Sequence, residues 1–156
     1  MKKRYTISVF TEDIVGLLNR VTIVFTRRKI NIESIAASDS EVQNIHRYTI
    51  VINETEDLVK KVTLQLDKQV EVIKAVYHLD EEIIYQEIAL FKVPTDILMQ
   101  GGEAEHIVRA HHARVLSVEP EFTVIEKTGH KEETQHLFDE LEPFGILEFV
   151  RSGRVA

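Results

Sequence analysis

The stretch TEDIVGLLNRVTIVF, residues 11–25, marks the point at which a strand is followed by a helix. Residues 5–11 before it alternate apolar and polar side chains, which is the pattern of a half-buried strand. From residue 15 to about residue 28, apolar side chains recur at spacings of three and four, which predicts a helix. Gly16 falls in the first turn of that predicted helix, where glycine costs about 0.5–1 kcal/mol relative to alanine. The position therefore needs an explanation.

The strand and helix open a unit that occurs twice. The first copy continues with strands over residues 31–37, 45–52 and 72–79 and with a second helix that carries Leu58, Val62, Leu66 and Val70. The second copy has a strand over 85–91, a helix from about Thr95 to His112 interrupted at Gly101-Gly102, strands over 114–118 and 122–126, a helix over 131–141 and a strand over 146–150. Each order is βαββαβ, which is typical of ferredoxin-like folds. We predict an α+β protein with two such domains in tandem, residues 1–79 and 83–156, separated by Asp80-Glu81-Glu82.

Composition limits the class of protein. Apolar residues make up 44% of the 156 residues and charged residues 29%, so a packed core is expected. No apolar run approaches the roughly 20 residues that span a bilayer, no secretory signal is recognisable, and cysteine is absent. These features predict a cytoplasmic protein without a membrane partner. The net charge of −7 argues against a nucleic-acid binder.

Catalytic and metal-binding patterns are not recognisable in the sequence. The spacing from His106 to His111 is i+5, and His111 and His112 are adjacent, so neither pair shares a helix face as the usual i, i+4 chelating pair does. We expect surface histidines and no metal site. Adjacent acidic residues rarely converge in a pocket, and the serines have no histidine and acid partners at motif spacing. The sequence thus predicts no catalytic residues.

Two explanations for Gly16 remain open at this point. A helix N-terminus offers unpaired backbone N–H groups and partial positive charge, so a glycine there lets a carboxylate or phosphate reach the backbone. Alternatively, glycine permits close packing of the helix against a neighbouring strand or subunit.

Three stretches of the sequence resemble a known family. The first is Asp13-x-x-Gly16-x-Leu18-x-Arg20-Val21, continued by Phe25-x-Arg27-Arg28-x-x-Asn31-Ile32-x-Ser34. The others are IALFKV at residues 88–93 and the closing PFGILEFVRSGRVA at residues 143–156. Together they resemble the ACT domain and second domain of the small, regulatory subunit of acetohydroxyacid synthase.

The resemblance implies a non-catalytic protein that activates a large catalytic subunit. It implies feedback inhibition by a branched-chain amino acid, with valine the foremost candidate. The thiamine diphosphate, Mg²⁺ and FAD of the reaction would be carried by the catalytic subunit, with no cofactor in this chain. It further implies a homodimer that pairs through its ACT domains and binds the effector at their interface. A free-standing ACT-type amino-acid sensor, acting on transcription or on another enzyme, is the alternative.

The resemblance also implies which residues bind the effector. The N–H groups of Gly16, Leu17 and Leu18 would receive its carboxylate, and Asn31 of the second copy would hydrogen-bond its amino or carboxylate group. The aliphatic side chain would be surrounded by Ile14, Val15 and Ile32.

Two residues depart from the family pattern. Asp13 stands where asparagine is common, and it would either face the effector's ammonium group or act as the helix N-cap. Lys29 stands where glycine commonly ends the helix, at a cost of about 1–2 kcal/mol if that position requires a positive φ.

Overall fold

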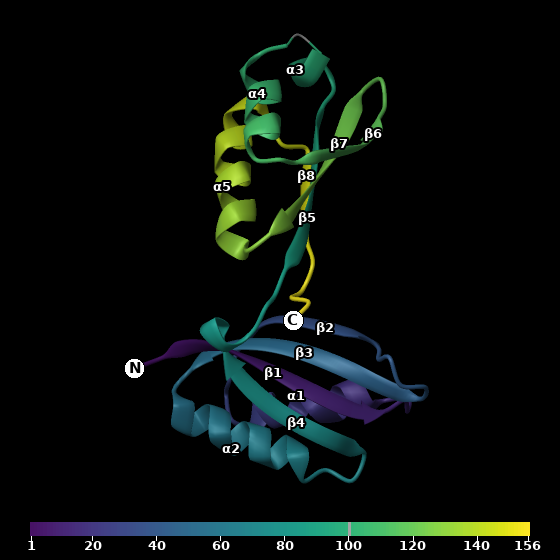
Figure 1. Cartoon of the computed structure of the whole chain (residues 1–156), viewed down its shortest axis with the longest axis vertical. Coiled ribbons are helices and arrows are strands. Elements are labelled where there is room, and N and C mark those ends of the chain that lie inside the picture. Colours follow the sequence, from purple (N-terminus) through teal and green to yellow (C-terminus); the bar gives the residue numbers. More distant parts are fainter. Residues whose placement is uncertain (100) are drawn as a thin grey trace. The chain divides into compact units, whose positions relative to one another are not determined.

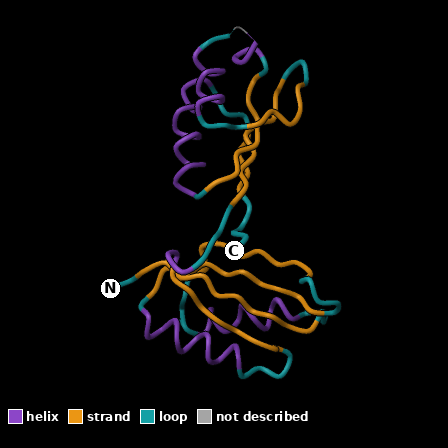
Figure 2. Tube along the Cα trace, viewed as in Figure 1, coloured by secondary structure: helices purple, strands orange, loops and turns teal. Residues whose placement is uncertain are grey.

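The chain forms two compact units in the computed structural model, which describes residues 1–99 and 101–156 (Figures 1 and 2). The first unit comprises Met1–Tyr85 together with Gly153–Ala156, and the second comprises Gln86–Ser152. The elements of the first unit are β1 (Lys3–Glu12), α1 (Leu17–Arg27), β2 (Ile32–Asp39), β3 (Ile45–Glu54), α2 (Glu56–Asp67), β4 (Val72–Leu79) and the 3₁₀ turn η1 (Asp80–Glu82). Those of the second are β5 (Glu87–Pro94), α3 (Asp96–Met99), α4 (Glu103–Ala110), β6 (Arg114–Val118), β7 (Phe122–Gly129), α5 (Lys131–Leu141), the 3₁₀ turn η2 (Glu142–Phe144) and β8 (Glu148–Arg151). The predicted βαββαβ order is confirmed in both units.

The first unit is an antiparallel sheet covered on one face by two helices. Its strand order is β2-β3-β1-β4, and Figure 1 shows α1 and α2 on the same side of it. Ile7 and Val9 of β1 are fully buried beneath Val21 of α1 and Leu66 of α2. Alternation on the strand and a three-to-four repeat on the helices thus supply the two sides of one core.

The second unit repeats this arrangement with the strand order β6-β7-β5-β8. Phe91 of β5 and Ile125 of β7 are fully buried against Leu137 of α5, and Val108 of α4 packs on the same cluster. The interruption predicted at Gly101-Gly102 is confirmed, because α3 ends at Met99 and α4 begins at Glu103. Gln100, which the predicted helix included, lies outside the described residues. No helix in the described part of the chain has the length and hydropathy needed to cross a membrane.

Several element boundaries differ from the prediction. Helix α1 begins at Leu17 rather than at residue 15, and β5 begins at Glu87 rather than at residue 85. Val70 was predicted on the second helix but is 94% exposed, because α2 ends at Asp67. The chain turns there, and the Asp67 carboxylate accepts a hydrogen bond from the N–H of Ala75 on β4 at 2.9 Å. Val70 continues the apolar repeat of α2 in the sequence but lies beyond the end of that helix.

The last four residues, Gly153–Ala156, belong to the first unit, whereas the predicted boundary placed them in the second. We call them the returning segment. Its Arg154 is 1% exposed, and the guanidinium donates to Thr6 Oγ1 at 2.9 Å and to Asp80 Oδ1 at 2.7 Å. The guanidinium carbon also lies 3.6 Å from the centre of the Tyr85 ring. A buried cation requires such partners, and the first unit supplies them.

Candidate functional site

Gly16 is the N-cap of α1 and has φ 84° and ψ 0°, in the left-handed region. L-residues with a side chain adopt this conformation at a cost of about 1–2 kcal/mol, so the backbone itself favours glycine. A Cβ built at Gly16 would meet no atom within 4 Å. Close packing within the described chain therefore does not explain the glycine. Its positive φ was missed from the sequence, because the predicted helix began at residue 15, two residues too early, and so included Gly16.

The start of α1 leaves backbone donors unused. The N–H of Leu17 makes a long hydrogen bond to the carbonyl of Ile14 at 3.4 Å, and Arg20 makes the first bond back to Gly16, also at 3.4 Å. Within the described ranges, the N–H groups of Gly16 and Leu18 have no hydrogen-bond partner. Together with the helix dipole, unpaired donors of this kind are suited to an anionic group.

Apolar side chains surround these donors and remain largely uncovered. Val15 is fully exposed, and Ile14 and Leu18 are each 47% exposed, whereas Leu17 is buried in the core. Three aliphatic side chains around a polar helix end suit a ligand with a carboxylate and an aliphatic body.

Asp13 lies beside a histidine rather than at the helix end. Its Oδ1 is 3.4 Å from His46 Nδ1, and Asp39 Oδ1 lies at the same distance from that nitrogen. The interpretation of Asp13 as N-cap was wrong, because Gly16 holds that position and no side chain caps the helix. Burial, and to a smaller extent the nearby Asp13 carboxylate, raise the pKa of Tyr48.

Asn31 and Ile32 lie at the opposite end of the sheet from Gly16. Ile32 pairs with Ile52 of β3, whereas Glu12, just before the Gly16 loop, pairs with Ile45. These two positions on β3 are seven residues apart, or about 23 Å in an extended strand. One copy of the chain therefore does not bring all the predicted effector-binding residues together. Asp13, Ile14, Val15, Gly16, Leu17 and Leu18 form one group, and Asn31 and Ile32 form another.

The turn that leads from α1 into Asn31 requires a positive φ at Lys29, whose φ is 56°. The N–H of Ile30 bonds to the carbonyl of Phe25, and that of Lys29 to the carbonyl of Thr26, both at 3.0 Å. This pair of bonds is a Schellman motif, which usually has glycine at the Lys29 position. The structure thus confirms the conformation that makes a lysine costly there.

The second unit repeats this turn after α4. His112 has φ 54°, and the N–H of Ala113 bonds to the carbonyl of Val108 at 3.1 Å. This second strained position was not predicted, because its match to Lys29 becomes evident only once the ends of α1 and α4 are aligned.

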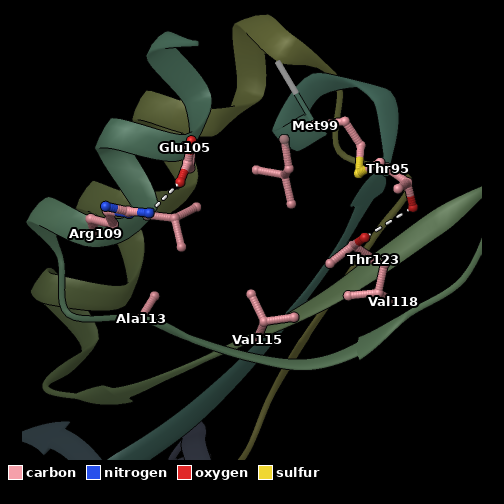
Figure 3. A pocket seen from close by; sticks show the side chains of 10 residues that line it. Thr95, Met99, Glu105, Arg109, Ala113, Val115, Val118 and Thr123 are labelled. Carbon is pink, nitrogen blue, oxygen red and sulfur yellow. Dashed lines mark hydrogen bonds and ion pairs between the residues drawn. The ribbon is translucent and has the colours of Figure 1, made fainter. Parts of the chain in front are cut away.

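A cavity of about 330 Å³ lies in the second unit between α3, α4 and the sheet (Figure 3). The Thr95 and Thr123 hydroxyls lie at one side, 2.9 Å apart, and the Glu105–Arg109 ion pair at 2.6 Å lies at the other. The remaining lining is apolar and comprises Leu98, Met99, Val108, Ala113, Val115 and Val118. None of the predicted effector-binding residues is among them, and no local motif could have revealed residues from so many elements.

Comparison with known proteins covers both units. Residues 7–74 match the family model of the AHAS small subunit-like ACT domain, and residues 86–156 match that of the small subunit of acetolactate synthase. The acetolactate synthase small subunit of Mycobacterium bovis is 38% identical over 157 residues, which cover 99% of this chain and 91% of that protein. The acetolactate synthase small subunit of Bacillus subtilis is 34% identical, covering 100% and 90%.

A solved structure of the same family also matches this chain. The crystal structure of the acetolactate synthase small subunit from Thermotoga maritima matches with a TM-score of 0.88 at 27% identity, covering 98% of this chain and 95% of that one. This chain belongs to the acetolactate synthase small-subunit family, and its first unit is an ACT domain.

Proposed function

We propose that this chain activates the thiamine-diphosphate-dependent catalytic subunit of acetohydroxyacid synthase and makes it sensitive to feedback inhibition by a branched-chain amino acid, valine above all. It acts in the cytoplasm and performs no catalysis itself. Relatives that match along nearly the whole chain are named small subunits of acetolactate synthase, which is another name for acetohydroxyacid synthase. Their names support the choice of partner.

The observation that carries the effector proposal is the start of α1. The unpaired N–H groups of Gly16 and Leu18 receive the effector carboxylate at the positive end of the helix dipole. The uncovered side chains of Ile14 and Val15 contact its aliphatic body. Because Gly16 has no side chain, the carboxylate approaches the backbone directly.

The ammonium group of the effector needs a negative partner. Asp13 and Asp39 supply two exposed carboxylates beside His46, at the same end of the sheet as the Gly16 loop. A zwitterionic amino acid would thus lie with its carboxylate at the helix and its ammonium group toward these acids.

A second copy of the chain completes the site. Strand β2 is an edge of the sheet, and edge strands are the ones whose backbone groups can pair with a strand of another chain. If two β2 strands pair antiparallel across a two-fold axis, the start of one lies beside the end of the other. Asn31 and Ile32 of the second copy then approach Asp39, and with it the effector end of the first copy.

A site built from two copies links binding to assembly. The effector contacts both copies and therefore stabilises the dimer in the arrangement to which it binds. A conformation of the catalytic subunit that binds this arrangement of the dimer more tightly then becomes more populated. Such coupling is usually about 1–3 kcal/mol, or roughly 5–150-fold in affinity.

Calorimetric titration with valine, leucine and isoleucine tests the effector site. Gly16→Asp is the disrupting variant, and Gly16→Asn is its matched control, because both residues tolerate positive φ but only aspartate adds charge. We expect saturable binding by the wild type, weaker binding by Gly16→Asn and none by Gly16→Asp. Equal binding by all three proteins would exclude the helix start as the carboxylate position.

The partnership is tested separately with purified catalytic subunit. Adding this chain should raise the rate of acetolactate formation, and valine should then inhibit the complex. Gly16→Asp should still activate but lose the inhibition. No change in rate and no co-purification would refute the regulatory role and favour a free-standing sensor.

A further inference from the structure

Three potential metal ligands meet between α4 and α5 of the second unit. His111 is the C-cap of α4, and His136 and Glu140 lie one turn apart on α5. His111 Nε2 is 2.6 Å from Glu140 Oε2, and His136 Nε2 is 3.4 Å from Glu140 Oε1. The two imidazole rings lie edge to face, with centres 5.0 Å apart.

The spacing of these atoms fits a small divalent cation. One ligand atom from each residue lies within 4.8 Å of the other two. Tetrahedral Zn²⁺, with bonds of about 2.0–2.1 Å, holds its ligand atoms about 3.3 Å apart. Binding would require the exposed His136 side chain to rotate toward the other two residues and the His111–Glu140 contact to open from 2.6 Å toward that separation.

The charges around the cluster also favour a cation. The ionic partners of Glu140 within residues 1–99 and 101–156 are the two histidines, and no lysine or arginine pairs with it. The His111 side chain is 13% exposed, whereas that of His136 is 66% exposed. The short contact joins His111 to Glu140, and His136 lies farther from the same carboxylate, so two imidazoles face one carboxylate.

We propose that His111, His136 and Glu140 bind a first-row divalent cation, with Zn²⁺ the best match. Two imidazoles and one carboxylate are borderline donors that suit Zn²⁺ and disfavour Mg²⁺ and Ca²⁺, which take oxygen ligands. The exposed side of His136 leaves the fourth position to water. This site is separate from the effector residues and does not depend on the proposed function.

The chain spacing of the histidines had predicted no metal site. His106, His111 and His112 lie on or directly after a single helix, α4. In the proposed site, His136 and Glu140 are an i, i+4 pair on α5, and the third residue, His111, comes from the end of the neighbouring helix α4.

Calorimetric titration of tag-free, chelator-treated protein with ZnCl₂ tests the site, with MgCl₂ as the comparison cation. His136→Gln removes an exposed ligand without disturbing the core, and His106→Gln on α4 removes an exposed histidine outside the cluster. We expect saturable Zn²⁺ binding that His136→Gln weakens by at least about tenfold and that His106→Gln leaves unchanged. Saturating Zn²⁺ should also shift the imidazole NMR signals of His111 and His136 but not that of His106. Absence of saturable binding by the wild type, or equal loss in both variants, would overturn the proposal.

Discussion

Replacing Arg154 by methionine should destabilise the first unit substantially. The substitution keeps most of the aliphatic volume and removes the guanidinium that binds Thr6 and Asp80 and stacks on Tyr85. Hydrogen bonds to charged groups contribute about 1.5–3 kcal/mol each. A desolvated cation–π contact adds about 1–2 kcal/mol.

Part of the stabilisation lost with these contacts is offset in the variant. The Asp80 side chain is 31% exposed, so water can solvate the carboxylate once the arginine is gone. The desolvation cost of burying the guanidinium also disappears. We therefore expect a net loss of about 2–4 kcal/mol in the free energy of unfolding.

The chain offers a natural probe for this measurement. It contains no tryptophan, and all four of its tyrosines, Tyr5, Tyr48, Tyr77 and Tyr85, belong to the first unit. Tyrosine fluorescence during urea unfolding therefore reports on the first unit alone. With a slope of about 2 kcal/mol/M, the midpoint should fall by roughly 1–2 M.

Arg109→Met is the matched control, because Arg109 is 76% exposed and forms an ion pair across one helical turn with Glu105 in the second unit. We expect it to change the tyrosine-detected midpoint by less than about 0.2 M. If Arg154→Met behaves like this control, the returning segment does not stabilise the first unit and the reasoning is wrong.

Two further predictions concern single positions. Lys29→Gly and His112→Gly should each stabilise their unit by about 0.5–1 kcal/mol, because relief of the positive-φ strain exceeds the entropy cost of glycine. A midpoint temperature below that of the wild type, in thermal unfolding monitored by circular dichroism, would contradict this. The hydrogen bond from Arg114, helped by Thr128, lowers the pKa of Glu126, so Arg114→Gln should raise that pKa toward its ordinary value in an NMR titration. A carboxylate whose pKa is lowered by folding stabilises the folded state at any pH above its pKa in the unfolded chain. This stabilisation is lost as the pH falls through the pKa of the folded state. The difference in unfolding free energy between wild type and Arg114→Gln should therefore vanish on acidification.

The regular elements could be predicted because each one repeats a local pattern. Alternation in residues 5–11 identified β1 and its buried face, and the three-to-four repeat identified α1 and α5. The ends of elements could not be placed as well, because they depend on backbone conformation. The left-handed φ of Gly16 moved the start of α1, and the turn after Asp67 left Val70 exposed.

Contacts between distant parts of the chain left no local pattern. Arg154 is buried through partners at the other end of the sequence, and its charge alone would have suggested a surface position. His111 and Glu140 meet only because α4 and α5 pack side by side. The effector residues were proposed from a family resemblance, and the structure shows why spacing alone could not join Asn31 to Gly16: they lie at opposite ends of one sheet.

The hydrogen bond between Thr6 and Arg154 joins residues 148 positions apart. At translation rates of about 5–20 residues per second, roughly 7–30 s pass between synthesis of the two partners. The strands of the first unit are complete at Leu79, yet its buried arginine arrives only after the whole of the second unit has been made. During synthesis the first unit therefore lacks its buried arginine until the second unit, which is complete only at Ser152, has been made.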